Sequence, residues 1–518
     1  MSCRFKSLLL KTTPKIFHGL INNNLPLFLF SVVYYVIMIV LSAYFNVWED
    51  EIYSLNTTSG SLSYAYRQSF DFEVQPPFWF LLLTIWRTIS DSILWARLFS
   101  MFLIIISQIL LYHFIKRISD KKLASLVSVL FILNPWIIFV ILEIRLFALV
   151  ILLSIIITAS FYQTYYPGNI TPVKRVLFIL TAIAALFTQY FMGFLLFANA
   201  IVLLFRRNRK PLIIYIIDMV IPLILVLLII PQILTGIDVQ TTVLQSEVID
   251  FKNYFVGTTR EFVRRIFDYL LPFSFNVSAF WYWTFRFSVI ILLLSSFNYG
   301  RIRKRVPELT PFIIISIVII LFFYILGYFF SDLYSANKYT LVLLIPLLLS
   351  LTILFRMVKP ELLNYWLILF SLIYITEDFN RYKKLYKIRD FPSLASYIEK
   401  NENPGESIFI YRNIGAENLE IYYKGVNDIY PLPQAFDFRG KFVPEQWEIS
   451  RSDIERLRQQ FDQQQSFYVI ISNMVNLKGF IESRALLLDF LESNYNLIEK
   501  ADIKGDILVY KYAGKTGD

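Results

Sequence analysis

The sequence predicts a mostly α-helical, polytopic membrane bundle followed by a soluble α/β domain. Three observations lead to this fold class. Hydrophobic residues make up 57% of the 518 residues and charged residues only 17%, whereas soluble domains have roughly 25% charged residues. Apolar windows of about 20 residues, the length that crosses a bilayer core, recur along the chain. From residue 377 the composition turns polar, so a single water-soluble globule is excluded.

Apolar windows predict eleven membrane spans, with a range of eleven to thirteen. They lie near residues 26–47, 93–115, 123–142, 146–163, 174–188, 191–205, 211–233, 276–297, 311–330, 339–355 and 363–376. The connections expected on the inner side carry 20 Lys and Arg, and those on the outer side carry 8. By the positive-inside rule the N-terminus is cytoplasmic and residue 377 is outside. The first span is expected to stay as an uncleaved anchor, since no cleavage site precedes it.

Two outer loops, 48–92 and 234–275, are long enough to carry structure of their own. The stretch 76–90 is apolar but too short to cross the membrane, so we expect an interfacial helix that begins at Pro76-Pro77. Within the third span, Asn134-Pro135 predicts a kink, because proline cannot donate a hydrogen bond to the preceding turn.

The polar C-terminal part alternates between two periodicities. Helical patterns at 393–400, 450–463 and 481–493 alternate with β-rich runs at 407–411, 466–472 and 506–512. We therefore expect a transmembrane domain over 1–376 and an extracytoplasmic α/β domain over 377–518.

The scarce residues limit the chemistry. Cys3 is the only cysteine, which excludes an intramolecular disulfide, a thiolate metal cluster and a Cys-x-x-Cys redox pair. The two histidines are His18 and His113, so carboxylates are the expected general bases. The net charge of +10 is explained by membrane topology, and no nucleic-acid partner is expected.

Polar residues collect at the outer ends of the expected spans. Glu49-Asp50-Glu51 follow the first span directly, and like charges packed so closely need a cation, a proton or a substrate nearby. They are either a solvated acidic loop or a general base or metal ligand at the membrane surface. Glu143 and Arg145 end the third span. They are either an ion pair that anchors the turn or part of a polar opening at the outer ends of the spans.

The order of these residues resembles the GT-C superfamily of polytopic glycosyltransferases, in the branch of the protein O-mannosyltransferases (glycosyltransferase family 39) and the lipid A aminoarabinose transferase. Six motifs carry the resemblance over the first 360 residues: Asp50-Glu51 with Tyr53, Gln75-Pro76-Pro77-Phe78-Trp79, Arg97-Leu98-Phe99-Ser100, Glu143-x-Arg145, Gln189-Tyr190-Phe191 and Lys338-Tyr339. Three positions depart from the family pattern: Gln75 replaces Lys or His, Gln189 replaces His, and Lys338 replaces Arg. A lysine holds a phosphate as a point charge, without the bidentate geometry of arginine.

The resemblance implies transfer of one sugar, a hexose or pentose, from a polyprenyl-phosphate donor to an acceptor hydroxyl on the outer face, with inversion. The implied catalytic residues are Asp50 as base with Glu51 and Glu143, the implied donor-phosphate residues are Arg145, Lys338 and Tyr339, and the implied substrate residues are Glu49, Tyr53, Gln75, Gln189 and Tyr190. A divalent cation such as Mg²⁺ or Mn²⁺ is left open, with Asp50 and Glu143 as its candidate ligands.

The implied partners are the polyprenyl-phosphate sugar, membrane lipid and an acceptor glycan, lipid or protein. The implied location is a bacterial inner membrane, with the C-terminal domain in the periplasm. The basic residues of the loop 234–275 are either a solvated helix face or a contact with lipid or donor phosphate.

Three other functions remain open from the residues alone. Asp218 and Arg286 lie inside expected spans, which keeps a transporter or flippase for a lipid-linked saccharide in view. A polysaccharide polymerase or ligase with a lipid diphosphate donor is a second alternative. A membrane scaffold that displays the C-terminal domain is the third.

Overall fold

The computed structural model describes residues 25–168, 170–244, 251–273, 278–329, 337–384, 386–439, 446–472 and 478–514. For some of these, including Lys338, only the backbone is described. The chain divides into two compact units. The bundle unit comprises Met1–Ala43, Arg97–Leu225 and Phe251–Lys383, and the α/β unit comprises Tyr44–Ala96, Val226–Asp250 and Lys384–Asp518.

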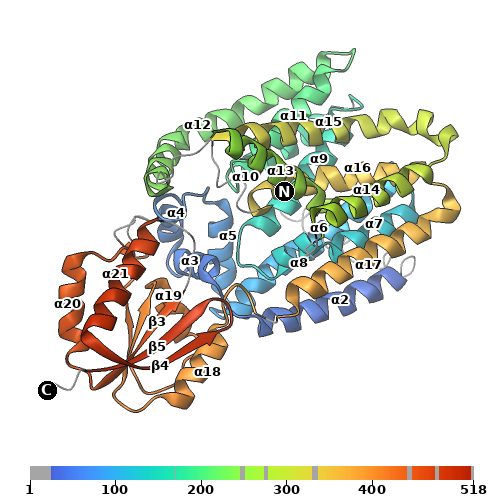
Figure 1. Cartoon of the computed structure of the whole chain (residues 1–518). Helices are drawn as coiled ribbons and strands as arrows, with labels where there is room; N and C mark the ends of the chain where they lie inside the picture. Colours follow the sequence, from blue (N-terminus) through green and yellow to red (C-terminus); the bar gives the residue numbers. More distant parts are fainter. Residues whose placement is uncertain are drawn as a thin grey trace. The chain divides into compact units, whose positions relative to one another are not determined.

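The bundle unit is built almost entirely from helices (Figure 1). In chain order they are α2 (Leu25–Tyr44), α6 (Ile93–Ile118), α7 (Lys121–Leu133), α8 (Pro135–Ile141), α9 (Phe147–Thr164), α10 (Pro172–Leu186), α11 (Met192–Leu204), α12 (Lys210–Leu244), α13 (Phe251–Leu270), α14 (Ala279–Ser295), α15 (Tyr299–Phe329), η2 (Asn337–Leu343), α16 (Leu344–Met357), η3 (Pro360–Leu362) and α17 (Leu363–Tyr382). The last residue of α2, residues 93–96 of α6 and residues 226–244 of α12 belong to the α/β unit.

Helix lengths confirm an integral membrane protein and refine the number of full crossings. Within the described part of the chain, seven helical stretches are long and apolar enough to cross a membrane, and the bent pair of α7 and α8 makes an eighth. The other three expected spans are also helices, but α10, α11 and α14 have only 15, 13 and 17 residues. The windows predicted at 174–188 and 191–205 match α10 and α11 to within two residues.

The predicted kink in the third span is confirmed. Helices α7 and α8 meet at 60°, and Asn134 lies between them with extended backbone angles. Its side-chain oxygen accepts a hydrogen bond from the backbone N–H of Trp136 at 3.0 Å, so Asn134 caps the second helix. Its amide nitrogen donates to the backbone oxygen of Tyr269 at 2.8 Å, which fixes the bend against α13.

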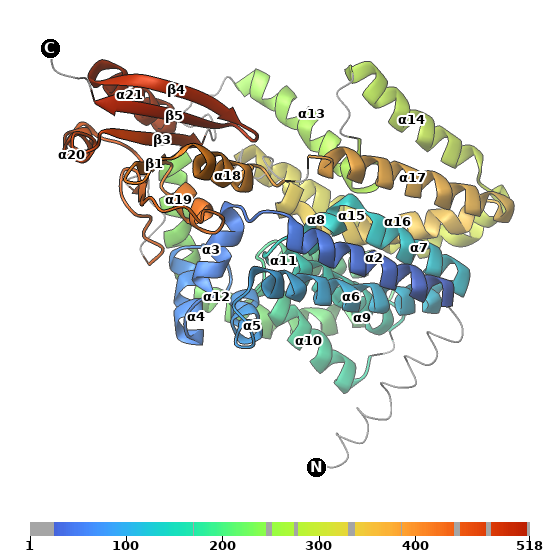
Figure 2. The same ribbon diagram turned by 90° about the horizontal axis from the view of Figure 1, so that it is seen from below.

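The α/β unit contains a five-stranded sheet of order β2-β1-β3-β5-β4. The strands are β1 (Ser407–Tyr411), β2 (Ile429–Pro431), β3 (Ser466–Ser472), β4 (Tyr495–Ile503) and β5 (Ile507–Gly514). Strands β2, β1 and β3 run parallel, and β5 and β4 add an antiparallel edge. The larger helices beside the sheet are α18 (Phe391–Asn401), α20 (Arg451–Phe461) and α21 (Lys478–Asn494), and the short α19 (Ile414–Glu420) follows β1 (Figure 2).

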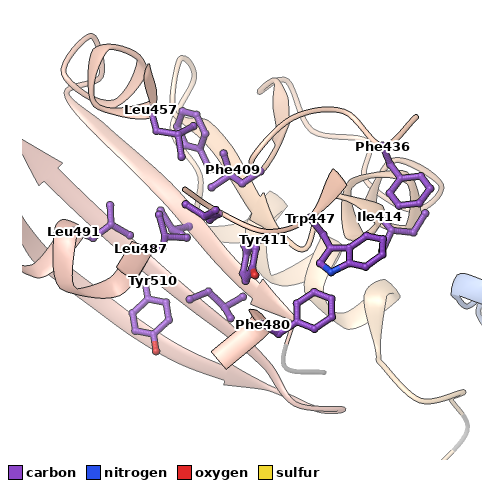
Figure 3. Close-up of a cluster of buried hydrophobic side chains, with 14 of the residues drawn as sticks. Phe409, Tyr411, Ile414, Phe436, Trp447, Leu457, Phe480, Leu487, Leu491 and Tyr510 are labelled. Carbon is purple, nitrogen blue, oxygen red and sulfur yellow. The ribbon is translucent and has the colours of Figure 1, made fainter. Parts of the chain in front are cut away.

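Alternate residues of each central strand enter two different hydrophobic clusters. Phe409 and Tyr411 of β1 pack with α20 and α21, as Figure 3 shows, whereas Ile408 and Ile410 pack with α18 and α19. Both faces of the sheet are therefore covered, as the continuous apolar strands require. The predicted α/β elements at 393–400, 407–411, 450–463, 466–472, 481–493 and 506–512 are confirmed by α18, β1, α20, β3, α21 and β5.

Three short helices from the segment between α2 and α6 belong to the same unit. They are α3 (Glu49–Thr57), α4 (Leu62–Asp71) and α5 (Phe78–Arg87). Helix α5 begins after Pro77 and has 10 residues, which confirms the short helix expected at 76–90. Its position at the membrane interface and a domain boundary at 376/377 stay predictions.

Candidate functional site

The predicted site residues divide between the two units. Those in the α/β unit are Glu49, Asp50, Glu51, Tyr53 and Gln75, and those in the bundle unit are Glu143, Arg145, Gln189, Tyr190, Lys338 and Tyr339. Each set is described separately below.

The acidic residues that open α3 are held by cations from the C-terminal part of the chain. Glu49 forms ion pairs with Arg389 and with Arg412, the latter at 3.1 Å. The Nζ atom of Lys387 lies 2.9 Å from a carboxylate oxygen of Glu51. Glu49 is 5% exposed and Glu51 is fully buried. Buried carboxylates persist only with such partners, so both are fixed in place.

Local hydrogen bonds bring these cations to the start of α3. The side chain of Asn46 accepts from the N–H of Lys387 at 2.7 Å and donates to the backbone oxygen of Arg389 at 2.7 Å. The hydroxyl of Tyr422 accepts from the N–H of Val47 at 2.6 Å. The carboxylates also lie at a helix N-terminus, where the helix dipole favours negative charge.

Packing fixes the other side of α3. Ile52 joins the hydrophobic cluster on the face of the sheet covered by α20 and α21. Tyr53 packs against Phe72 and Phe436, with ring centroids 5.3 and 5.9 Å away. Burial raises the pKa of Tyr53 above its ordinary value, so its hydroxyl stays protonated. The helix therefore has little freedom to rotate about its axis.

Asp50 differs from its two neighbours in exposure. It is half-buried, whereas Glu49 and Glu51 are buried. Successive helical residues are rotated by about 100°, so Asp50 points away from the directions taken by Glu49 and Glu51. Asp50 is thus a carboxylate with access to solvent, at the start of a helix that two buried, ion-paired neighbours hold in place.

Burial and charge act in opposite directions on Arg412. Burial alone would lower the pKa of its guanidinium, but Glu49, Tyr53 and Tyr411 together outweigh that effect and hold the pKa above its ordinary value. The guanidinium also lies over the ring of Phe480, 4.9 Å from its centroid. Arg412 is thus a fixed positive charge beside the acidic residues.

Sequence reasoning missed Lys387, Arg389 and Arg412. They lie more than 330 positions from Glu49 and Glu51, and no periodicity links segments so far apart. The only available signal was complementary charge, because Lys387-Ile388-Arg389 is a basic run close to the expected end of the last span.

Gln75 and Arg87 belong to the helices that follow α3. The half-buried Gln75 donates its backbone N–H to Ser69 at 2.8 Å, just before Pro76. The guanidinium of Arg87 donates to the backbone oxygen of Leu55 at 2.6 Å and to the hydroxyl of Thr58 at 2.8 Å. Arg87, which the sequence did not single out, therefore ties α5 to the end of α3.

In the bundle unit, the turn between α8 and α9 carries Glu143 and Arg145. Glu143 is 3% exposed, and its backbone oxygen accepts a hydrogen bond from the hydroxyl of Ser100 at 2.7 Å. Arg145 is half-buried. The nearby Arg97, 1% exposed, donates to the backbone oxygen of Ser42 at 2.6 Å and so joins α6 to α2.

Gln189 and Tyr190 form the turn between α10 and α11. Gln189 is 3% exposed and Tyr190 is half-buried. Tyr339 lies half-buried in η2. The side chain of Lys338 lies outside the described residues, so its expected phosphate contact stays a prediction.

Asp218 and Arg286, the two residues on which the transporter alternative rests, are both paired. Asp218 accepts hydrogen bonds from Arg175 at 2.6 Å and from the Tyr165 hydroxyl at 2.6 Å. Arg286 forms an ion pair with Asp268, and its guanidinium lies 4.1 Å from the ring centroid of Tyr282. Each residue therefore has a partner of opposite charge within the bundle unit.

The divalent cation expected with Asp50 and Glu143 as its ligands stays a prediction, because these two residues belong to different units. Among side chains that the structure describes, no group of three or more His, Cys, Asp or Glu is arranged to hold a metal ion. Glu49 and Glu51 already bind protein cations, whereas Mg²⁺ and Mn²⁺ need several oxygen ligands. No catalytic step is therefore assigned to a metal.

Comparison with known proteins gave structural likenesses only. No family model matches the chain, and no curated protein matches it. The chain is similar to the crystal structure of ArnT from Cupriavidus metallidurans in the apo state, with 10% identity, a TM-score of 0.42, and coverage of 93% of this chain and 97% of that one. The same protein bound to undecaprenyl phosphate gives 11% identity, a TM-score of 0.41 and the same 93% and 97% coverage.

A third similar structure is the oligosaccharyltransferase of Archaeoglobus fulgidus in complex with Zn and sulfate. The identity is 13%, the TM-score 0.38, and the coverage 85% of this chain and 65% of that one.

Proposed function

We propose that this integral membrane protein is an inverting glycosyltransferase. It transfers one hexose or pentose from a polyprenyl-phosphate donor to an acceptor hydroxyl at the outer face of a bacterial inner membrane. The observation that carries the proposal is the start of α3, where buried ion pairs fix Glu49 and Glu51 and leave Asp50 partly exposed. Asp50 follows the end of α2 by six residues, which keeps it near the membrane surface.

In the proposed reaction, Asp50 accepts the proton of the acceptor hydroxyl while the acceptor oxygen attacks the anomeric carbon. The bond from that carbon to the phosphate oxygen breaks, and its electron pair leaves with the polyprenyl phosphate. Attack from the side opposite the leaving group inverts the anomeric configuration. A base in hydrogen-bonding reach of the reacting hydroxyl contributes about 10²–10⁴-fold in rate.

The leaving phosphate gains negative charge as the bond breaks, and positioned cations lower the energy of that state. Arg145 and Lys338 take this role in the proposal, with Tyr339 as a hydrogen-bond donor. Glu143 orients these groups or the sugar, and Gln189 and Tyr190 contact the substrate. Glu49 and Glu51 act through Asp50, as positioning residues.

The paired state of Asp218 and Arg286 favours an enzyme over a transporter. A transporter needs ionisable groups near the bilayer midplane that exchange partners during its cycle. Asp218 instead accepts three hydrogen bonds from Arg175 and a fourth from Tyr165. Such an arrangement supports a static role.

The test uses the purified full chain in lipid nanodiscs with a polyprenyl-phosphate hexose, a polyprenyl-phosphate pentose and native membrane lipids as acceptors. We expect release of polyprenyl phosphate together with a glycosylated acceptor of inverted anomeric configuration, read by mass spectrometry and NMR. Movement of the intact donor across a proteoliposome membrane without release of polyprenyl phosphate would identify a flippase and overturn the proposal.

A further inference from the structure

The last turn of α17 carries an arginine that lies outside all six sequence motifs. Glu377 and Arg381 are one helical turn apart, and their side chains form an ion pair of 3.2 Å. The Glu377 side chain is 2% exposed, whereas 27% of the Arg381 side chain is exposed. A buried carboxylate therefore anchors one side of a guanidinium group that a ligand can reach.

A second contact orients the same guanidinium group. Its carbon atom lies 4.9 Å from the ring centroid of Trp136, at the start of α8. The indole N–H of Trp136 donates to the backbone oxygen of Asp268 at 3.1 Å, which holds the ring in place. Toward the residues that the structure describes, Arg381 donates one hydrogen bond, to Glu377. A guanidinium has five N–H donors, so donors remain for an anion.

Arg381 lies near Glu143, a residue of the proposed reaction. The hydroxyl of Tyr382, the next residue of α17, interacts electrostatically with both the Arg381 guanidinium and the Glu143 carboxylate. Glu143 also follows the end of α8 by two residues, and α8 is the helix whose Trp136 contacts Arg381. Arg381 and Glu143 therefore belong to one polar region of the bundle unit.

A chain of contacts joins Arg381 to η2 as well. The ring centroid of Trp136, over which Arg381 lies, is 5.8 Å from that of Tyr269 in α13. The hydroxyls of Tyr269 and Thr340 form a hydrogen bond, and Thr340 directly follows Tyr339 in η2. Arg381 is thus linked through two aromatic side chains to the segment that carries Tyr339, an expected phosphate residue.

Accessibility distinguishes Arg381 from two buried arginines of the same unit. Arg97 is 1% exposed and Arg286 is fully buried, so neither reaches a ligand without a rearrangement of its surroundings. Arg381 combines an orientation that two contacts fix with a part of its guanidinium that is accessible. A positioned cation that binds an anion needs both properties.

We infer that Arg381 binds the phosphate of the polyprenyl-phosphate donor, together with Arg145 and Lys338. The inference rests on the proposed function, because it adds a contact to the same donor. Arginine binds phosphate through charge-assisted hydrogen bonds that are often paired, and the ion pair with Glu377 keeps the guanidinium in place. As the bond from the sugar to the phosphate breaks, the positive charge lowers the energy of the leaving group.

A purely structural role for Arg381 is the alternative. Arg381 would then only hold α17 against α8 through its contact with Trp136. Its loss would lower the melting temperature without changing how well the protein distinguishes a phosphate from an uncharged ligand. The two roles therefore differ in the ligand preference that they predict.

The experiment is isothermal titration calorimetry of the full chain in nanodiscs with two probes, a short-chain polyprenyl phosphate and the matching neutral polyprenol. The wild type should bind the phosphate about tenfold or more tightly than the polyprenol. Arg381→Ala should weaken binding of the phosphate about tenfold, the effect of one lost charge-assisted contact, and leave polyprenol affinity unchanged. Arg381→Lys should recover part of the phosphate affinity, because lysine keeps the charge without the planar fork.

The matched control is Arg356→Ala, which removes another ion-paired arginine of the bundle unit, whose partner is Glu308. It should bind both probes as the wild type does, and a loss as large as in Arg381→Ala would overturn the inference. Should Arg381→Ala fail to fold, Arg381→Gln gives the same comparison, because its amide can still donate to Glu377.

The remaining outcomes separate the inference from the proposed function. Wild-type phosphate affinity in a folded Arg381 variant without the charge would overturn the inference and leave the proposed function standing. Equal weakening of both probes in that variant would assign Arg381 a structural role and overturn the inference as well. A wild type that binds polyprenyl phosphate no better than polyprenol would instead contradict the proposed function, and the inference with it.

Discussion

The two units of the molecule handle buried charge differently. In the bundle unit, Asp218 meets Arg175 and Arg286 meets Asp268, so each ion pair joins one acid to one base. In the α/β unit, Glu49 and Glu51 bind three cations, and a third carboxylate, Asp50, stands between them in sequence. The bundle pairs neutralise charge in an apolar setting. The α/β cluster additionally holds the start of the helix that carries the partly exposed Asp50.

The largest effect on stability is expected from Arg389→Ala in the α/β unit. The side chains of Arg389 and Glu49 are 4% and 7% exposed, and removing one partner of a buried pair costs about 3–5 kcal/mol. The melting temperature of the purified protein should fall, and transfer activity should fall with it because α3 loses an anchor. Arg389→Lys should restore part of the melting temperature and part of the transfer activity. An Arg389→Ala variant with the melting temperature and transfer activity of the wild type would show that these ion pairs do not hold α3 in place.

A different outcome is expected from Asp218→Asn in the bundle unit. The substitution removes the charge that Arg175 and Tyr165 contact, so the melting temperature should fall by less than in Arg389→Ala. Arg175 is 36% exposed and keeps access to water. Transfer per folded molecule should remain within about twofold of the wild type, well below the tenfold that 1.4 kcal/mol represents. Complete loss of transfer in a folded variant would give Asp218 a functional role and revive the transporter alternative.

Sequence patterns predicted most of the fold because the relevant signals are local. Apolar windows located the helices, Asn134-Pro135 located the bend, and alternation of periodicities located β1, β3 and β5. The edge strand β4 was missed because its outer residues, such as Glu499 and Lys500, are exposed and charged. The ends of α10 and α11 lie within two residues of the predicted windows, because Gln189 interrupts the apolar run between them.

The candidate site was predictable only in part. The cluster of acids at Glu49-Asp50-Glu51 is visible in the sequence, but the roles of its members depend on partners more than 330 positions away. Burial separates the two ion-paired glutamates from Asp50, and burial of a given carboxylate follows from tertiary packing.

The smallest effect is expected from Glu406→Gln, which tests a third kind of ion pair, at the end of the sheet. Burial tends to raise the pKa of Glu406, but hydrogen bonds from Lys511, Ser466 and Asn403 together hold it below its ordinary value of 4.5. A carboxyl with a lowered folded-state pKa stabilises the fold above its unfolded pKa and loses that contribution as the pH falls. The wild type should therefore lose stability as the pH falls below about 4.5.

In Glu406→Gln the corresponding part of this acid dependence should be absent, so the melting temperatures of variant and wild type should converge toward low pH. The measurement is the melting temperature between pH 3 and pH 7. An unchanged difference between the two proteins over that range would show that Glu406 does not titrate with a lowered pKa.

The most direct measurement compares Asp50→Asn with Glu49→Gln for both donor turnover and melting temperature. Asp50→Asn removes the proposed base from a helix whose anchors remain, so turnover should fall about 10²-fold or more while the melting temperature stays near that of the wild type. Glu49→Gln weakens two buried ion pairs, so its melting temperature should fall clearly. A folded Asp50→Asn variant whose turnover stays within tenfold of the wild type would contradict the account. A group other than Asp50 would then accept the proton of the acceptor hydroxyl.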